Sequence, residues 1–266
     1  MKQYKAEDHT FVICAYKESP FLEECIQSLE KQTVKSTIKM VTSTPNEYIA
    51  DMAKKHNIEL IVNEGQGGIV QDWNFGYKQI DTPYVTIAHQ DDVYFPEYTE
   101  TLLKEFERSK HPLIFFTDYW ELRNGEYVKE NKLLKVKRIM LIPLKTRLFF
   151  NSRFVRRRIL SFGSPICCPS VGYVRANLPN PIFEVGFRSN EDWQAWEKLS
   201  KLKGSFIYCK KPLVAHRIHE DSETSAIIAD NKRSDEDEVM FSKFWPKFIV
   251  KILVKFYAKG QDSNNM

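Results

Sequence analysis

Residues 89–92 place a histidine and two adjacent aspartates, His89, Asp91 and Asp92, directly after a short apolar run. Two neighbouring carboxylates repel each other, so the pair is unfavourable unless a cation or hydrogen-bond donors neutralise it. Carboxylate oxygens are the ligands that Mg²⁺ and Mn²⁺ prefer, and these ions commonly bring phosphate oxygens as further ligands. The pattern therefore favours a divalent metal site for a phosphorylated ligand, and the alternative is a solvated surface turn.

The elements that must position this cluster alternate between strands and helices. Strand and helix alternating at the observed spacing predict an α/β protein with a mostly parallel sheet and helices on both faces. Ligands of such sheets bind beyond the carboxyl ends of the strands, which is where the cluster lies. The predicted strands are 10–16, 38–43, 58–62 and 84–88, and the predicted helices between them are 21–29, 46–56 and 70–80.

Two common phosphate-binding motifs are missing from the sequence. The exit of the first predicted strand, residues 14–19, has no Gly-x-Gly-x-x-Gly, and no P-loop motif occurs anywhere. Dinucleotide-binding and P-loop chemistry are therefore disfavoured. A sugar-phosphate nucleotidyltransferase is an alternative enzyme class, but it would normally open with a glycine-rich loop, and residues 16–20 contain no glycine.

The composition is that of an ordinary globular protein. Of 266 residues, 42% are hydrophobic and 28% are charged, which excludes wholesale disorder and a polytopic membrane protein. The five cysteines are odd in number and have no Cys-x-x-Cys spacing, which fits a reducing compartment. The first residues show no secretory signal, so we expect a cytoplasmic protein.

Positive charge is concentrated in residues 129–158 and 239–260. The first segment holds eleven lysines and arginines against one glutamate, and we expect it to touch a membrane or an anionic acceptor. Nucleic acid is disfavoured because few stacking aromatics accompany this charge. The second segment has a lysine at every fourth position from 243 to 259, which predicts an amphipathic basic helix, too short in apolar sequence to span a bilayer.

That C-terminal helix has two interpretations. It lies on anionic lipid as a peripheral element at the inner face of the membrane, or it packs on the domain with its lysines in solvent. A non-catalytic membrane-surface scaffold is the matching non-enzymatic alternative for the whole chain. The residues predicted to contact the membrane are Lys243, Trp245, Lys247, Phe248, Lys251 and Lys255.

Taken in order, several blocks of the sequence resemble an inverting family 2 glycosyltransferase with the GT-A fold. The blocks are the strand and loop at 11–19, the stretch 63–76 that ends Trp-Asn-Phe-Gly, residues 89–92, residues 190–193, and residues 216–219 with Ser222 and Thr224. The resemblance implies a Rossmann-like mixed sheet flanked by helices. It also implies metal-dependent transfer of a sugar from a nucleotide diphosphate donor to a hydroxyl group.

The resemblance also implies roles for individual residues. Asp91 matches the metal-binding acid, His219 completes the metal or diphosphate site, and Asp192 matches the catalytic base. Glu191 beside it is expected to keep the proton affinity of Asp192 high by like-charge repulsion. Trp193 and Trp196 either stack on an acceptor sugar or belong to the core. The expected donor-binding residues are Ala15, Tyr16, Glu18, Asn74, His89, Asp91 and Arg217.

Two departures from the family pattern concern the donor. The chain has His89 where the family usually has an acid, and Ser43 follows the second strand where an acid usually reads the base. A UDP-sugar is the default donor, and a dTDP-sugar is the alternative. The expected cofactor is Mn²⁺ or Mg²⁺, and the expected acceptor is a lipid-linked or glycan precursor of a cell-surface polysaccharide or glycolipid.

The predicted organisation is one glycosyltransferase domain followed by a C-terminal extension. The domain covers residues 1–230, with a donor half of about 1–128 and an acceptor half of about 129–230. The amphipathic basic helix and a tail occupy residues 231–266.

Overall fold

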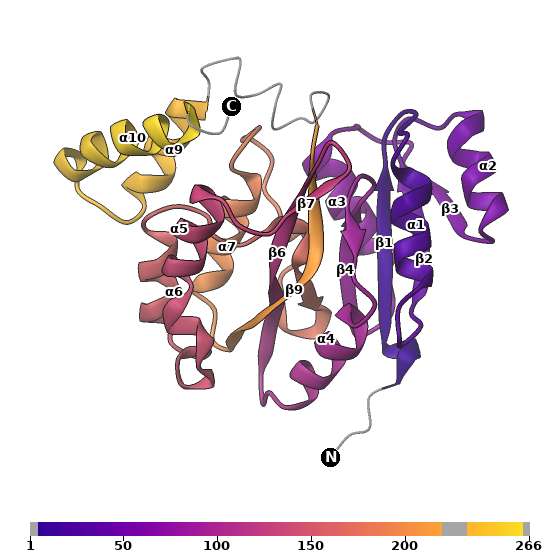
Figure 1. The fold of residues 1–266 in the computed structure, drawn as a ribbon, viewed down its shortest axis with the longest axis horizontal. Coiled ribbons are helices and arrows are strands. Elements are labelled where there is room, and N and C mark those ends of the chain that lie inside the picture. The colour runs from indigo at the N-terminus through magenta and orange to yellow at the C-terminus, as the bar shows by residue number, and fades with distance from the viewer. Residues whose placement is uncertain (1–4, 220–232, 263–266) are drawn as a thin grey trace.

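A nine-stranded mixed sheet forms the centre of the computed structural model, which describes residues 5–219 and 233–262 (Figure 1). The strand order is β3-β2-β1-β4-β8-β6-β9-β5, and β7 pairs with β6. The strands are β1 (His9–Ala15), β2 (Thr37–Thr42), β3 (Glu59–Val62), β4 (Tyr84–His89), β5 (Val93–Tyr94), β6 (Pro112–Arg123), β7 (Glu126–Val128), β8 (Gly172–Val174) and β9 (Ser205–Ile218). The helices are α1 (Leu22–Glu30), α2 (Glu47–Lys55), α3 (Ile69–Lys78), α4 (Tyr98–Glu107), α5 (Lys132–Met140), α6 (Arg153–Leu160), α7 (Glu191–Ser200), α9 (Arg233–Ser242) and α10 (Lys247–Asp262).

The N-terminal half of the sheet is parallel, as the alternating pattern predicted. β1 pairs in parallel with β2 and β4, and β2 pairs in parallel with β3. The helix α3 packs closely on this part of the sheet, because a Cβ atom at Gly76 would lie 3.0 Å from Val12 Cγ2 and 3.2 Å from Val41 Cγ2. The glycine therefore permits an approach that a larger residue would prevent. The predicted α/β architecture is confirmed.

The C-terminal half of the sheet changes direction twice. β8 is antiparallel to both β4 and β6, whereas β6 and β9 run parallel to each other. Two reversals restore the original direction, so β4, β6 and β9 all end at the same edge of the sheet. Segments more than a hundred residues apart in sequence are thereby brought to one edge.

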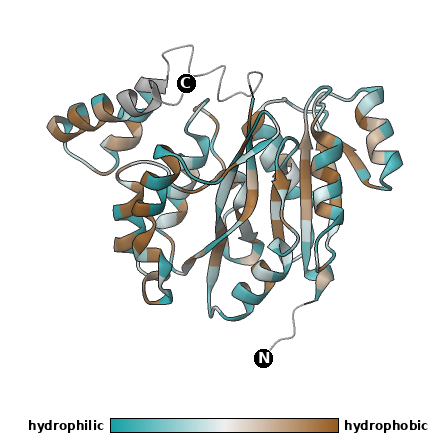
Figure 2. Ribbon diagram, viewed as in Figure 1, coloured by the Kyte–Doolittle hydropathy of each residue, from teal (hydrophilic) through white to brown (hydrophobic). Residues whose placement is uncertain are grey.

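Residues 132–160, which show no clean period in the sequence, form the helices α5 and α6. A side-chain cap begins each helix, since Asn131 Oδ1 accepts a 2.8 Å hydrogen bond from Leu134 N and Ser152 Oγ accepts a 3.2 Å hydrogen bond from Val155 N. Both helices also leave apolar side chains in solvent, which obscures their amphipathic pattern. Figure 2 shows hydrophobic residues along α5 and α6 at the outer edge of the molecule.

The predicted single C-terminal helix is two helices, α9 and α10. Residues 243–246 interrupt the helix, and Pro246 precedes the first residue of α10. Proline lacks the amide hydrogen that a helix interior requires, which explains the break. The two helices form a hairpin whose inner side packs on the domain through buried Phe241 and Val250. No helix within the described ranges is long and apolar enough to cross a membrane.

The outer side of α10 is also apolar. Phe248, Ile252 and Phe256 are 69%, 53% and 72% exposed, and their spacing of four residues places them in one row along the helix. A lysine directly precedes each of them. The outer side of α10 therefore combines a row of apolar side chains with a row of positive charges.

Candidate active site

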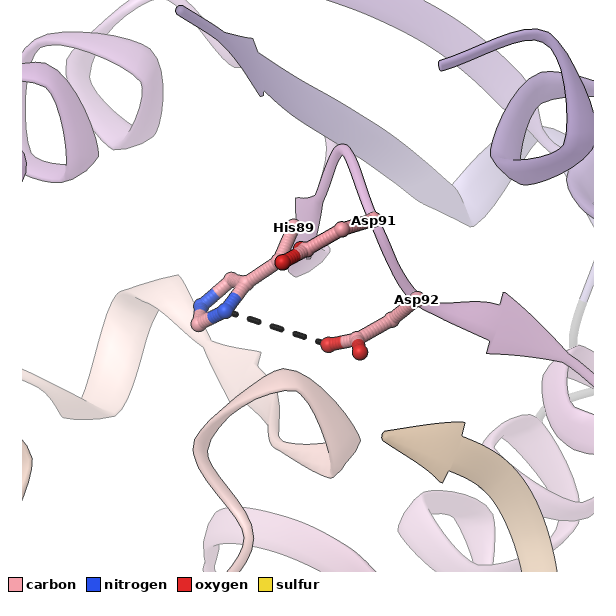
Figure 3. A group of neighbouring side chains, drawn as sticks. All are labelled: His89, Asp91 and Asp92. Atoms are coloured by element: carbon pink, nitrogen blue, oxygen red, sulfur yellow. Dashed lines mark ion pairs between the residues drawn. The ribbon is translucent and has the colours of Figure 1, made fainter. Parts of the chain in front are cut away.

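The turn after β4 gathers three side chains that suit a cation (Figure 3). One ligating atom from each of His89, Asp91 and Asp92 lies within 4.8 Å of the others. Asp92 is fully buried, and neither its Oδ2 atom nor the Nε2 atom of His89 has a hydrogen-bond partner among the described residues. Buried polar atoms are costly when they lack partners. Two carboxylates and an imidazole, two of which have a buried atom without a described hydrogen-bond partner, fit a divalent cation.

The carboxyl end of β9 supplies the other half of this site. Asp92 Oδ1 accepts a 2.8 Å hydrogen bond from the backbone N–H of Arg217 and lies 3.0 Å from His216 Nδ1. His219 Nε2 lies 3.1 Å from Asp91 Oδ2. The contact arises because β5, directly after the turn, pairs with β9. The structure thus brings together residues 89–92 and 216–219. Two further residues of the predicted motif lie outside the described residues: Ser222 and Thr224.

The surroundings of residues 89–92, which we call the metal turn, favour the neutral form of His89 and the charged form of Asp91. Burial lowers the pKa of His89, which leaves a nitrogen lone pair available at neutral pH. Burial opposes ionisation of Asp91, but the hydrogen bond from His219 and the nearby histidines outweigh it and lower the pKa of Asp91. Burial also opposes protonation of His216, but the charge of Asp92 outweighs it and raises the pKa of His216. A neutral His89 and an ionised Asp91 suit cation binding.

Asp192 lies in the first turn of α7, within electrostatic range of the metal turn. Its Oδ1 accepts a 2.6 Å hydrogen bond from Trp193 N, and Ser164 Oγ lies 3.4 Å from its Oδ2. The charge of Asp192 acts on His89, and the charges of Asp192 and Asp92 both contribute, after burial, to a raised pKa of the Cys167 thiol. Electrostatic effects of this kind act between nearby groups. Asp192 and the metal turn therefore border the same part of the molecule.

Gln90 connects the metal turn to the end of β1. Its Oε1 accepts a 2.9 Å hydrogen bond from Tyr16 N, and its Nε2 donates a 3.1 Å hydrogen bond to Tyr16 O. Sequence reasoning missed Gln90, although a polar amide inside the 89–92 cluster was a readable signal. Of the other predicted donor-binding residues in this loop, Tyr16 and Glu18 are exposed, whereas Ala15 is buried.

Two further residues predicted to bind the donor are engaged by the protein itself. Asn74 Nδ2 donates a 2.9 Å hydrogen bond to Phe183 O, and Asn74 Oδ1 accepts a 3.1 Å hydrogen bond from Phe183 N. Arg217 Nε donates a 2.8 Å hydrogen bond to Asp91 O, and its Nη2 contacts the carboxylate of Glu24. Asn74 thus fixes the loop around residue 183, and Arg217 fixes the metal turn.

The two tryptophans of α7 belong to the core. Trp193 and Trp196 are both fully buried, and Trp193 Nε1 donates a 3.0 Å hydrogen bond to Leu160 O. Trp196 stacks on Tyr173 with ring centroids 6.2 Å apart. Neither indole presents a face to an acceptor sugar, so the stacking interpretation is wrong and the core interpretation is correct. Their neighbour Glu191 is also buried, at 7% exposed.

A carboxylate that sequence reasoning did not single out lies beside the end of β2. Asp72 of α3 is 7% exposed and accepts hydrogen bonds from Ser43 Oγ at 2.6 Å and from Asn63 Nδ2 at 2.8 Å. The family pattern leads one to expect an acid where the chain has Ser43, and the structure places an acid next to that serine on another element. The position of Asp72, one turn before Gly76 in a helix packed on β2, was the available signal.

The residues predicted to contact a membrane separate into two groups. Trp245 Nε1 donates a 2.7 Å hydrogen bond to Ser161 O, and Lys243 Nζ lies 3.9 Å from Glu197 Oε2. Trp245 and Lys243 therefore belong to the contact between the hairpin and the domain. The others are exposed on α10: Lys247, Phe248, Lys251 and Lys255.

Comparison with known sequences identifies a family and two relatives. The sequence model of glycosyl transferase family 2 matches residues 10–176. An uncharacterized glycosyltransferase of Rickettsia bellii is 21% identical over 260 residues, which are 92% of this chain and 34% of the relative. The uncharacterized glycosyltransferase EpsJ of Bacillus subtilis is 27% identical over 111 residues, which are 40% of this chain and 32% of the relative. The matched part of the chain thus spans only about a third of the length of either relative.

Comparison with solved structures shows the fold. Residues 1–349 of S. aureus TarS in complex with UDP-GlcNAc match with a TM-score of 0.63 at 17% identity, covering 92% of this chain and 70% of that one. The mannosyltransferase PcManGT from Pyrobaculum calidifontis, in complex with GDP-Man and Mn²⁺, matches with a TM-score of 0.62 at 12% identity, covering 96% and 70%. The expected GT-A fold is confirmed.

Proposed function

The chain belongs to glycosyl transferase family 2, and from this premise we propose that it transfers a sugar from a nucleotide diphosphate sugar to a hydroxyl group of an acceptor. The observation that carries the proposal is that Asp192 lies within electrostatic range of His89, which belongs to a turn that fits a divalent cation. A base and a site for a diphosphate counter-ion are the two parts that such a transfer needs.

In the proposed reaction, His89, Asp91 and Asp92 would hold Mn²⁺ or Mg²⁺, with His219 next to Asp91. When bound, the cation supplies positive charge to the diphosphate as negative charge builds on that leaving group. The presence of Mn²⁺ with GDP-Man in the solved mannosyltransferase supports this assignment. Arg217 holds the carbonyl of Asp91 and thereby keeps the turn in shape.

Asp192 is the proposed general base. It takes the proton from the acceptor hydroxyl while the hydroxyl oxygen forms a bond to the anomeric carbon of the sugar. The bond between that carbon and the diphosphate oxygen breaks on the opposite side, and the nucleoside diphosphate leaves with the electron pair. The configuration at the anomeric carbon is therefore inverted.

The proposed donor is a UDP-sugar, with a dTDP-sugar as the alternative. The structure of TarS with UDP-GlcNAc supports a uridine nucleotide, whereas the mannosyltransferase binds GDP-Man. The carboxylate of Asp72 lies beside the end of β2, the place where family members have a base-reading acid. We assign Asp72 to the neighbourhood of the base on that ground.

The proposed acceptor is a lipid-linked or glycan precursor of a cell-surface polysaccharide or glycolipid, reached at the cytoplasmic face of the membrane. The outer side of α10 supports this proposal because Phe248, Ile252 and Phe256 are exposed beside lysines. Phe154 of α6 extends the surface, since it is 72% exposed and the Arg158 guanidinium lies over both its ring and that of Trp245. Apolar side chains beside lysines suit the interface of an anionic bilayer.

Flotation with vesicles of phosphatidylglycerol and phosphatidylcholine tests the membrane proposal. Replacing Lys247, Lys251 and Lys255 by Gln should weaken binding by roughly 100-fold, because each lysine near an anionic surface contributes about 1 kcal/mol. A matched triple variant at Lys31, Lys54 and Lys78, all exposed in the donor half, should bind as the wild type does. Equal binding by both triple variants would contradict the proposal.

A panel of nucleotide sugars tests the transfer itself. Thermal stabilisation should require both the donor and Mn²⁺ or Mg²⁺, since a ligand at about 100 times its dissociation constant adds roughly 2.7 kcal/mol to the free energy of unfolding. Release of nucleoside diphosphate should then depend on an acceptor. Release of pyrophosphate from a sugar phosphate and a nucleoside triphosphate would instead identify a nucleotidyltransferase, and vesicle binding without any turnover would identify a scaffold.

A further inference from the structure

The residues just before α7 are held by a carboxylate from the C-terminal hairpin. Glu236 of α9 accepts hydrogen bonds from the backbone N–H groups of Arg188 at 2.7 Å, Ser189 at 3.0 Å and Asn190 at 3.1 Å. It also accepts a 2.6 Å hydrogen bond from Ser189 Oγ. Three successive backbone N–H groups converging on one anion form a strong binding site for it. Here the anion is part of the protein.

A second acidic residue of α9 holds the next position. The side chain of Asn190 is 3% exposed, and its Nδ2 donates a 2.8 Å hydrogen bond to Asp237 Oδ1. The side chain of Asn190, the residue before α7, makes no capping hydrogen bond to the helix. The first turn of α7 therefore depends on α9 for its position.

The hairpin also fixes the residue on the other side of Asp192. Trp193 packs against Phe241 of α9 with ring centroids 5.1 Å apart and against Tyr257 of α10 at 6.0 Å. Asp192 thus lies between a segment held by carboxylates and an indole held by aromatic rings. Both sets of contacts come from the hairpin.

We propose that Glu236 and Asp237 are positioning residues for the base Asp192, so that the C-terminal hairpin is a working part of the active site. The inference rests on the proposed function, because Asp192 matters to catalysis only if the chain transfers a sugar. General-base catalysis depends on the distance from the base to the proton that it takes. Charge-assisted hydrogen bonds are stronger than neutral ones, which makes a carboxylate an effective anchor for the turn.

The test compares Glu236→Gln with Glu238→Gln in the full chain. Both changes remove one negative charge from α9, but Glu238 is exposed. Hydrogen exchange measured by mass spectrometry on the peptide covering residues 188–193 should become about tenfold faster or more in Glu236→Gln, as loss of charge-assisted hydrogen bonds predicts. Glu238→Gln should exchange at the wild-type rate.

Steady-state kinetics provide the second measurement. Glu236→Gln should lower kcat by about tenfold or more while KM for the donor stays within about twofold, since the base is displaced and the donor site is not. A merely structural role would leave kcat unchanged at temperatures where the variant is folded. Ser189→Ala, which removes one of the hydrogen bonds and keeps the carboxylate, should show a smaller change of the same kind.

Each outcome decides the question. Unchanged exchange at residues 188–190 in Glu236→Gln overturns the inference, as does faster exchange with an unaltered kcat. If Glu236→Gln does not fold, an unaltered kcat and exchange rate in Ser189→Ala overturn it. A wild-type protein that transfers no sugar from any donor refutes the proposed function, while the exchange measurement still shows whether Glu236 anchors the turn.

Discussion

Replacement of Asp192 by Asn tests the base most directly. The amide has nearly the same shape as the carboxylate, so its oxygen can still accept the hydrogen bond from Trp193 N. Trp193 itself is buried, which keeps the first turn of α7 in place. The substitution therefore removes the proton acceptor and keeps the hydrogen bond from Trp193 N.

The expected loss follows from the role of a general base. Such a group typically contributes a factor of about 10²–10⁴ in rate, which corresponds to about 2.7–5.4 kcal/mol in the activation barrier. The donor should still bind, because the metal turn and the end of β1 are joined by Gln90 and not by Asp192. We expect kcat to fall by that factor while donor-dependent thermal stabilisation persists.

The assay measures release of nucleoside diphosphate with a donor and acceptor identified by the panel. Asp51→Asn, an identical chemical change at an exposed position of α2, is the matched control and should retain wild-type turnover. More than about a tenth of wild-type kcat in Asp192→Asn would refute the assignment of the base. Loss of donor binding together with turnover would place Asp192 in the donor site instead.

Three further changes follow from the structure. Asp91→Ala should abolish the Mn²⁺-dependent part of donor stabilisation in a thermal melt, with Asp51→Ala as control, and an unchanged metal dependence would count against the metal site. Burial lowers the pKa of His9 to about 3, so in mildly acidic solution the unfolded chain binds a proton that the folded chain does not. The free energy of unfolding should therefore decline as pH falls below about 6.5, by about 2 kcal/mol between pH 8 and pH 5. Denaturant melts of His9→Gln should lack that decline. Gly76→Ala should destabilise the fold by about 0–2 kcal/mol in the same melts, because the new methyl group presses on Val12 and Val41 at a cost of about 1–3 kcal/mol while alanine gains about 1 kcal/mol in helix propensity. A clearly stabilised variant would show that Val12 and Val41 move aside without cost.

The parallel half of the fold could be predicted because its signals are local. Each predicted strand from residue 10 to residue 88 has a counterpart in β1 to β4, since short buried strands read as apolar runs bounded by polar turns. The cluster at 89–92 could be located for the same reason. The prediction of a metal site there rested on the adjacency of Asp91 and Asp92 in sequence.

The acceptor half could not be predicted in the same way, because its order depends on contacts between distant segments. β6 and β9 pair over most of their lengths although about ninety residues separate them, and no local pattern specifies that pairing. The helix α6 buries Arg156 and exposes Phe154, which is the reverse of what hydropathy alone indicates. Its cap, Ser152, was a readable signal that the surrounding charge obscured.

Side-chain orientation was the second feature that could not be predicted from the sequence. The spacing of Trp193 and Trp196 places them on one side of a helix but does not say whether that side meets substrate or core, and only packing against the sheet and the hairpin decides it. The lysine pattern of the C-terminal segment likewise placed apolar residues on the other sides of the helix without saying which of them meet the domain. α10 has two, because Val250 packs inward while Phe248 points to solvent.

The direction of β8 explains why the active site is assembled from such distant parts. The short strand β8 lies antiparallel between β4 and β6, and β9 is parallel to β6, so β4, β6 and β9 all end at the same edge of the sheet. Asp92 uses this arrangement directly, since it follows β4 and accepts the hydrogen bond from Arg217 N on β9. Asp192 comes from α7, and Glu236, from beyond β9, holds the backbone of residues 188–190 just before it. The residues just before Asp192 are therefore held by the C-terminal hairpin, which lies beyond the match to the family model at residues 10–176.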